Sequence, residues 1–179
     1  LRVDRSRFDE FTESFRRLVP GLRNVGIGTP DPASRQLVLE FDNGFKTPAD
    51  NTSAGVKLLA FFMALVFHPV PPHIILIEEP ETGLHPRRLK DVMGLLREIT
   101  QGKHGGHPAQ VVLTTHSPYL LDLVDLAEDM VLVFRRAADG TRSVEPVDAE
   151  RLRAFLEHEF LLGEVWYNQG EEGLVKQTA

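Results

Sequence analysis

Apolar residues recur along the chain with helical spacing in three segments. Over residues 4–18 they fall three or four positions apart, with charged residues between them, which predicts an amphipathic helix. Residues 86–100 repeat this spacing, and Pro86 suits the first position of a helix. Residues 56–67 (VKLLAFFMALVF) are apolar on nearly every face and therefore predict a helix that is buried all round.

Shorter apolar runs, bounded by turn residues, predict strands. The runs at 22–27 and 36–41 are separated by GTPDPAS and are expected to pair as an antiparallel hairpin. The runs at 73–77 and 110–115 are rich in β-branched residues, as is typical of central parallel strands that are covered on both faces. Strands that alternate with helices in this way predict an α/β fold with a mostly parallel sheet flanked by helices.

The last part of the chain adds a hairpin and a helix. A strand at 130–135 is expected to turn at Ala138-Asp139-Gly140 and return at 141–147. Asp148 then caps a helix with four apolar residues directed inward. These inward residues are Leu152, Phe155, Leu156 and Phe160.

Length and composition fit one soluble domain over residues 1–179, with an N-terminal helix within 1–21 and a loosely ordered tail at 170–179. No run approaches the roughly 18 apolar residues of a membrane span, and LRVDRSRFDEF is no signal peptide, so a cytoplasmic protein is the simplest interpretation. The absence of cysteine excludes disulfides and thiol nucleophiles. The net charge of −6 disfavours broad nonspecific binding to nucleic-acid phosphates.

Two of the expected parallel strands end in residues that can carry chemistry. Glu78 and Glu79 follow the first strand, at the end where open parallel sheets collect ligands. Adjacent carboxylates are costly to bury, and Mg²⁺ would remove that cost, although a solvated pair explains the dipeptide equally well on its own. His116 follows the second strand, before a helix opened by Ser117 and Pro118. We therefore expect Glu78, Glu79 and His116 to face one crevice.

The segments IILIEEPETGLHP and TTHSPYLLD together resemble the Walker B, D-loop and switch-histidine segments of RecF/SMC-like ABC ATPase heads, especially predicted ATPases related to the OLD family. The resemblance runs from about residue 20 to residue 170 and includes LLGEVWYNQG. It implies a P-loop NTPase fold that uses ATP and Mg²⁺. Glu78 would hold the metal, Glu79 would be the general base, and His116 would contact the γ-phosphate, although a helix-capping role for His116 stays open.

The signature loop departs from the family pattern. Relatives carry a sequence like LSDGT before the buried helix, whereas this chain has NTSAGV. Ser53 and Gly55 remain and would face the γ-phosphate of ATP bound by an opposite subunit, although Ser53 also suits a plain helix cap. Gly83 and His85 would lie at a contact between two heads or simply form the entry to a helix. The resemblance thus implies a head-to-head homodimer.

No Walker A motif, G-x-x-x-x-G-K-[ST], occurs in the chain, so we expect it to be inactive alone. In the family this motif lies upstream, and the first residue is Leu1 rather than Met, so we expect a fragment or one piece of a split head that needs a Walker A-bearing N-terminal lobe. The alternative is a noncatalytic scaffold for a partner such as a nuclease. DNA binding through Arg87, Arg88 and Lys90 is a third hypothesis, but such a cluster is more often a solvated helix face.

Two histidine motifs predict no site. His158 and Glu159 begin the zinc-protease pattern H-E-x-x-H, but Leu162 occupies the position of the second metal ligand. His104 and His107 flank two glycines and could bind a metal, but a solvated loop is the better interpretation.

Overall fold

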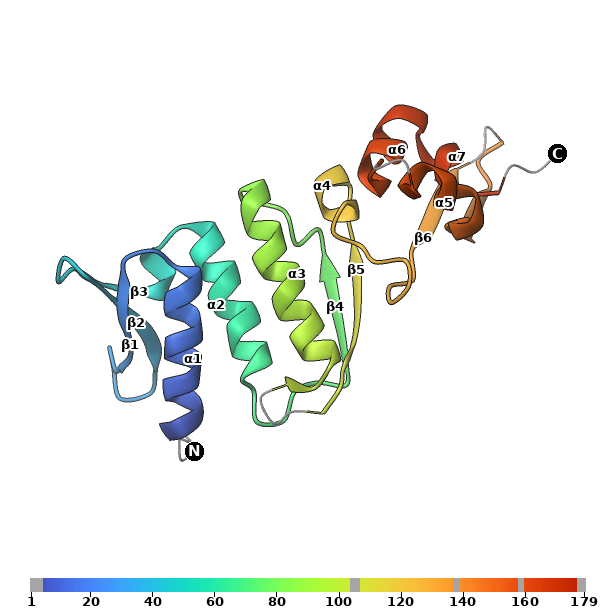
Figure 1. The fold of residues 1–179 in the computed structure, drawn as a ribbon. Helices are drawn as coiled ribbons and strands as arrows, with labels where there is room; N and C mark the ends of the chain where they lie inside the picture. Colours follow the sequence, from blue (N-terminus) through green and yellow to red (C-terminus); the bar gives the residue numbers. More distant parts are fainter. Residues whose placement is uncertain (1–4, 104–106, 137–138, 158–159, 177–179) are drawn as a thin grey trace. The chain divides into compact units, whose positions relative to one another are not determined.

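The fold is that of a computed structural model, which describes residues 5–103, 107–136, 139–157 and 160–176. The zinc-protease pattern at 158–159 and the side chain of His104 lie outside these ranges. The chain divides into two compact units, Leu1–Thr114 and Thr115–Ala179, which are coloured blue to yellow and yellow to red in Figure 1. The expected organisation as a single domain stays a prediction.

The first unit contains three helices, one short 3-10 helix and five strands among its described residues. They are α1 (Arg5–Leu18), β1 (Leu22–Gly28), β2 (Gln36–Phe41), β3 (Lys46–Pro48), η1 (Ala49–Asn51), α2 (Ala54–Val66), β4 (Ile74–Glu78), α3 (Pro86–Thr100) and β5 (Gln110–Thr114). The helices α1, α2 and α3 lie side by side, with α3 between α2 and the β4–β5 pair (Figure 1).

The N-terminal helix and hairpin form as the sequence predicts. In α1, Phe11 and Phe15 are buried, and the Phe11 ring meets the ring of Phe67 edge to face with centroids 5.9 Å apart. Strands β1 and β2 pair antiparallel, from Leu22 opposite Phe41 to Gly28 opposite Gln36. The sequence did not indicate β3, which is only three residues long and joins β2 through the Asp42-Asn43-Gly44 turn.

The predicted parallel pair is confirmed for β4 and β5, in register from Ile74 opposite Gln110 to Glu78 opposite Thr114. Helix α3 has the predicted bounds and packs on one face of the pair through its apolar side. The buried residues of α3 are Leu89, Val92, Met93, Leu95, Leu96 and Ile99. Pro86 is the first residue of α3, as its fixed φ favours.

The prediction that these strands are covered on both faces is wrong. Ile74, Leu76 and Val112 are 59%, 76% and 46% exposed, whereas Ile75 is buried. Side chains alternate across a strand, so one face packs on α3 and the other presents apolar residues to solvent. The expectation that α2 is buried all round is also wrong, because Phe61 is 53% exposed. The β4–β5 pair and α2 thus both carry apolar residues that the described part of the chain does not cover.

The second unit contains α4 (Pro118–Leu121), β6 (Leu132–Arg136), β7 (Arg142–Pro146), α5 (Ala149–Glu157), α6 (Leu162–Gln169) and α7 (Glu171–Leu174). Strands β6 and β7 form the expected antiparallel hairpin. Arg135 donates to the carboxylate of Glu145 across this hairpin, and this hydrogen bond lowers the pKa of Glu145. Leu132, Phe134 and Val144 share one face of the hairpin and are exposed.

The C-terminal helices close a small core of their own. Asp148 accepts a hydrogen bond from the backbone N–H of Arg151, which confirms it as the cap of α5. Phe160, which was expected to point inward, is instead half exposed because it lies beyond the end of α5. Within the expected loose tail, Gly173, Leu174 and Val175 are buried, whereas Glu171, Glu172 and Lys176 are exposed. The core consists of Leu121, Val133, Leu152, Leu162, Val165, Leu174 and Val175.

Gly163, in the first turn of α6, lies against the backbone of α4. Its N–H donates to Oδ1 of Asp122 at 2.8 Å, and a Cβ placed here would lie 2.1 Å from the carbonyl oxygen of Pro118. The carbonyl oxygen of Pro118 belongs to the backbone of α4, so it cannot move aside as the end of a flexible side chain can. We therefore expect Gly163→Ala to lower the free energy of unfolding by about 2–3 kcal/mol in chemical denaturation.

Gly94→Ala is the matched control for this change. A Cβ at Gly94, on the exposed side of α3, would meet no heavy atom within 4 Å. Alanine is the better helix former, so this change is expected to stabilise the protein by about 0.5–1 kcal/mol. Equal effects of the two substitutions would contradict the close approach of α6 to α4.

Candidate active site

The carboxylate pair lies at the carboxyl ends of β4 and β5. Glu78 is the last residue of β4 and is opposite Thr114, the last residue of β5. The backbone N–H of Glu79 donates to the carbonyl oxygen of Thr114 at 3.0 Å, which extends the ladder by one further bond. The Glu78 side chain is exposed, and Glu79 is half-buried. The structure therefore places both carboxylates at the strand end that the sequence indicated.

Glu79 has an uncommon backbone conformation. Its φ is +43°, and among the described residues it alone combines a positive φ with a side chain. This left-handed conformation costs roughly 1–3 kcal/mol and persists only where the surroundings hold it. Two hydrogen bonds do so here, one from the Glu79 N–H to Thr114 and one from the Thr82 N–H to the Glu79 carbonyl oxygen at 2.9 Å. Strained residues of this kind cluster at functional sites.

The segment between Glu79 and α3 is a chain of tight turns. After the turn closed by Thr82, the N–H of Leu84 donates to the carbonyl oxygen of Glu81 at 2.9 Å, and Gly83 supplies the positive φ of +82° that this second turn needs. His85 then caps α3, its Nδ1 accepting a hydrogen bond from the Arg87 N–H at 3.2 Å. The helix-entry role of His85 is thus observed.

The signature-like loop contacts these turns. Ser53 is the N-cap of α2 and is exposed, with its hydroxyl oxygen 3.4 Å from the N–H of Val56. A Cβ added to Gly55 would lie 3.3 Å from Cδ2 of Leu84, and one added to Gly83 would lie 3.5 Å from Cβ of Ala54. Small residues therefore allow the start of α2 to approach the turn at residues 81–84 closely, and this turn lies in the segment that resembles a D-loop. This contact could not be predicted from the sequence, because the two segments are far apart along the chain.

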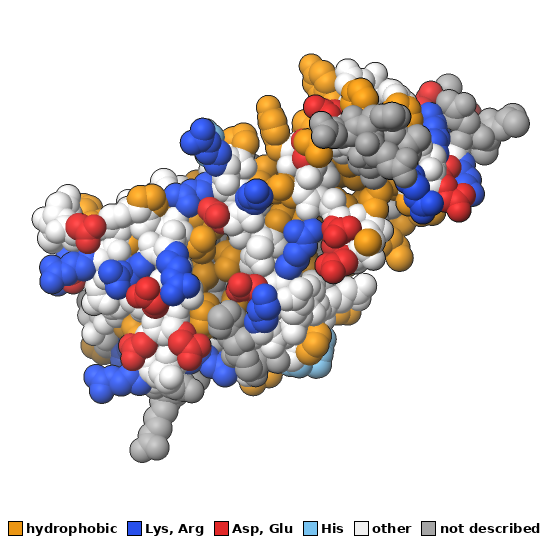
Figure 2. Space-filling view, in the orientation of Figure 1, with side chains coloured by type: hydrophobic (Ala, Val, Ile, Leu, Met, Phe, Trp, Pro, Cys, Tyr) orange, Lys and Arg blue, Asp and Glu red, His pale blue; other side chains and the backbone are white. Residues whose placement is uncertain are grey.

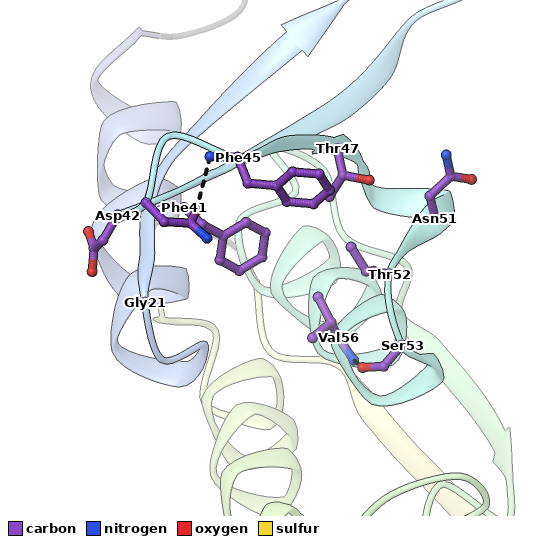
Figure 3. A pocket seen from close by; sticks show the side chains of 10 residues that line it. Gly21, Phe41, Asp42, Phe45, Thr47, Asn51, Thr52, Ser53 and Val56 are labelled. Carbon is purple, nitrogen blue, oxygen red and sulfur yellow. Dashed lines mark hydrogen bonds between the residues drawn. The ribbon is translucent and has the colours of Figure 1, made fainter.

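A pocket of about 590 Å³ lies beside Ser53, between the β2–β3 turn and the start of α2. In Figure 3 the rings of Phe41 and Phe45 and the side chain of Ser53 surround one hollow. The two ring centroids are 6.4 Å apart. Because the signature-like loop forms one wall, this pocket places exposed apolar surface next to the residue expected to face an opposite subunit.

Comparison with known families decides the class of protein. Residues 3–122 match the family described as "AAA domain, putative AbiEii toxin, Type IV TA system", and this match covers more than half of the chain. The chain belongs to this AAA domain family. It is therefore a lobe of an ABC/AAA-type ATPase, as the Walker B and switch-histidine segments indicated. A comparison with curated proteins finds no significant match.

Solved SMC ATPase heads share the fold of this AAA domain. One, from work on ATP-driven dimerization and DNA-stimulated activation of SMC ATPases, aligns with a TM-score of 0.59 at 18% identity over 87% of this chain and 91% of that chain. The Pyrococcus yayanosii Smc head with a coiled coil and joint gives 0.59 at 18% identity, over 87% of this chain and 29% of that one. The Pyrococcus furiosus Smc head bound to the C-terminal domain of ScpA gives 0.59 at 17%, over 87% and 38%.

These alignments show that the chain has the P-loop NTPase fold of SMC heads, with a parallel pair of strands and antiparallel hairpins. The chain spans less than half the length of the two Pyrococcus structures. Among its described helices, none combines the length and the apolar character that crossing a bilayer requires.

The predicted switch residue His116 lies in the second unit of the AAA domain. It is exposed and follows β5, and the next residue, Ser117, donates its N–H to Oγ1 of Thr115 at 3.0 Å. Ser117 stands at the N-cap position of α4, but its side chain makes no capping bond there. The crevice expected for Glu78, Glu79 and His116 spans the two units and stays a prediction.

The residues at the strand end fit a Mg²⁺ ion whose remaining ligands come from a nucleotide. Within the described ranges, no three acidic or histidine side chains gather closely enough to form a protein-only metal site. Mg²⁺ bound with a nucleotide usually takes one or two carboxylates, and phosphates and water supply its other ligands. The exposed carboxylate of Glu78 suits this role. His107 instead lies against His73, with ring centroids 4.1 Å apart and ring planes tilted by 37°.

The basic cluster on α3 is partly used inside the fold. Arg88 donates to the carbonyl oxygen of Leu18 and to Oδ2 of Asp91, the latter at 3.0 Å, so it joins α3 to the end of α1. Arg87 and Lys90 are exposed. Figure 2 shows Lys and Arg side chains interspersed with Asp and Glu on the face of the first unit that it draws. This pattern does not favour the DNA-binding hypothesis, which stays untested.

Proposed function

We propose that this AAA domain is the signature and Walker B half of an ATP-hydrolysing head, active together with a lobe that carries a Walker A segment. The observation that carries the proposal is the left-handed conformation of Glu79 at the end of β4. Residues held in such a strained conformation cluster at active sites, where the surrounding structure holds them against the cost. A general base must be held within hydrogen-bond reach of the attacking water, and it is a group for which such a cost is warranted.

Each site residue has a distinct role in this proposal. Glu79 accepts a proton from, or orients, the water that attacks the γ-phosphate, and His116 donates to that phosphate. Glu78 holds Mg²⁺ at the strand end, directly or through water. When bound, the metal neutralises charge on the phosphates. The protein therefore contributes position and charge, which is the main requirement of phosphoryl transfer.

The Walker A lobe is proposed to cover apolar surface that the described chain leaves exposed. Ile74, Leu76 and Val112 lie on the open face of β4–β5. Contiguous apolar surface of this kind marks an interaction site. Parallel sheets are usually covered on both faces, so a further layer on this face supplies what the fold lacks. The hairpin β6–β7 offers a second exposed apolar face, through Leu132, Phe134 and Val144.

The proposed assembly is a cytoplasmic head-to-head homodimer that contacts through the signature and D-loops. Ser53 and Gly55 stand at the N-terminus of α2, where backbone N–H groups favour a bound anion. The close approach of Gly55 to Leu84 and of Ala54 to Gly83 sets both loops on one part of the surface. ATP bound to an opposite head would meet Ser53 and Gly55 when the dimer closes. A nuclease or DNA would bind through other regions of the complete protein.

Removal of the metal tests the role of Glu78. Chelation of Mg²⁺ is expected to abolish ATP hydrolysis by the complete protein. Glu78→Ala should raise the Mg²⁺ concentration that gives half the maximal rate by about tenfold or more, because one ligand of the metal or of its water is lost. The measurement is phosphate release at a series of Mg²⁺ concentrations.

Glu13→Ala is the control for this experiment, since Glu13 is an exposed glutamate on α1 that pairs with Arg16. The Glu13→Ala variant should show the same Mg²⁺ dependence as the wild type. A Glu78→Ala variant with an unchanged Mg²⁺ dependence would show that the metal is held elsewhere.

A further inference from the structure

Thr82, in the D-loop turn, contacts the proposed base at two points. Its Oγ1 donates to Oε2 of Glu79 at 3.3 Å, and its backbone N–H donates to the Glu79 carbonyl oxygen at 2.9 Å. The first bond joins the two side chains, and the second closes the turn that holds the left-handed backbone of Glu79. One residue therefore contacts both the backbone and the carboxylate of Glu79.

The contact with the Thr82 hydroxyl determines the direction of the Glu79 carboxylate, which the backbone conformation alone does not determine. A glutamate carboxylate is separated from its backbone by three rotatable bonds, so a fixed φ does not fix the position of its oxygens. A hydrogen bond to a carboxylate oxygen is stronger than one between neutral groups. The bond is exposed in the described chain, and it would strengthen further when a bound nucleotide and an opposite head exclude water. The Thr82 hydroxyl thus favours side-chain conformations of Glu79 in which Oε2 faces the turn.

Thr82 is itself held by its neighbours. It lies inside the second turn, which the Leu84 N–H closes on Glu81, and it precedes Gly83, whose positive φ completes that turn. Gly83 lies against Ala54 at the start of α2. The turn that carries the hydroxyl therefore lies against the start of α2.

We propose that Thr82 is a positioning residue for the general base: its hydroxyl orients the Glu79 carboxylate toward the attacking water. This inference rests on the proposed function, because it assigns Thr82 no contact with nucleotide and no role apart from Glu79. The predicted signature is a loss of kcat that a serine restores and that disappears when Glu79 can no longer act as a base.

The test measures steady-state ATP hydrolysis by the complete protein with Thr82→Val and Thr82→Ser. Valine keeps the shape of threonine and removes the hydroxyl, so kcat should fall about tenfold. The KM for ATP should stay within about twofold of the wild type, since the hydroxyl acts on the base. Thr82→Ser should keep most of the wild-type kcat. Thr100→Val, at the far end of α3, is the matched control and should leave kcat unchanged.

The same substitution in a Glu79→Gln background separates positioning from folding. If Thr82 acts through Glu79, Thr82→Val should lower the residual rate there by less than about twofold. A tenfold loss in that background, a Thr82→Ser variant as slow as Thr82→Val, or an unchanged kcat in Thr82→Val would each overturn the positioning role. A Glu79→Gln variant with wild-type turnover would instead overturn the proposed function itself, so the two failures are distinguishable.

Discussion

Steady-state ATP hydrolysis by the complete protein is expected to fall at least about 100-fold in the Glu79→Gln variant, because an amide cannot take the proton of the attacking water. Glutamine keeps the length of the side chain and an oxygen that can accept the Thr82 hydroxyl, so the turn from Glu79 to Thr82 should persist. ATP binding should therefore remain while turnover is lost. Phosphate release and binding of a fluorescent ATP analogue measure the two properties separately.

Glu13→Gln, on the exposed surface of α1, is the matched control and should hydrolyse ATP at the wild-type rate. If Glu79→Gln kept wild-type turnover, Glu79 would not be the base, and its strained backbone would need another explanation. If ATP binding were lost as well, the variant would report on assembly of the site, and the assignment of a base would not be supported.

Ser53→Asp is expected to reduce ATP hydrolysis about 100-fold, because it replaces a donor to the γ-phosphate with a negative charge. Aspartate is as good an N-cap as serine, and a negative charge favours the N-terminus of α2. The thermal stability of the protein should therefore stay the same or rise. Activity and stability should move independently, which separates the nucleotide-facing role of Ser53 from its observed capping role.

Ser6→Asp is the control for this substitution, since Ser6 is an exposed serine in the first turn of α1. It should alter neither activity nor stability by much. A Ser53→Asp variant with wild-type turnover would leave Ser53 as a helix cap only. It would also remove the main reason for proposing that two heads share a nucleotide.

Patterns of apolar spacing were sufficient to predict most of the elements. Helix α3 was predicted with its observed bounds, because Pro86 and the positions from Leu89 to Ile99 agree on one helix. The parallel pairing of β4 with β5 followed from two short β-branched runs separated by a helix. The three-residue strand β3 was missed, since it is too short to show alternation.

Burial was harder to predict than secondary structure. The run from Ile74 to Ile77 is apolar at every position, as expected for a strand between two layers, yet the described chain supplies only one layer. A single sequence shows that a face needs covering but not which segment covers it. The close contact at Gly163 could not be predicted for a related reason. In a single sequence, a glycine that makes room for a neighbouring carbonyl oxygen looks the same as a glycine that allows a turn.

The location of the site could be predicted, but its geometry could not. Two acidic residues after an apolar strand indicated the strand end where Glu78 and Glu79 lie. The left-handed backbone of Glu79 could not be predicted from the sequence, because the positive φ of a non-glycine residue depends on the hydrogen bonds that hold it. The bond from Thr82 and the packing of Gly83 on Ala54 likewise depend on turn geometry and tertiary contact.

In the proposed dimer, one hydrolysis site combines Glu79 of one head with Ser53 of the other. Mixing Glu79→Gln protein with Ser53→Asp protein and measuring ATP hydrolysis tests whether the two heads share the site in this way. Each variant alone is inactive at both sites of a symmetric dimer, whereas a mixed dimer keeps one site with both residues intact. Random exchange should therefore restore about a quarter of the wild-type rate. A mixture no more active than the average of the two variants would contradict the shared site.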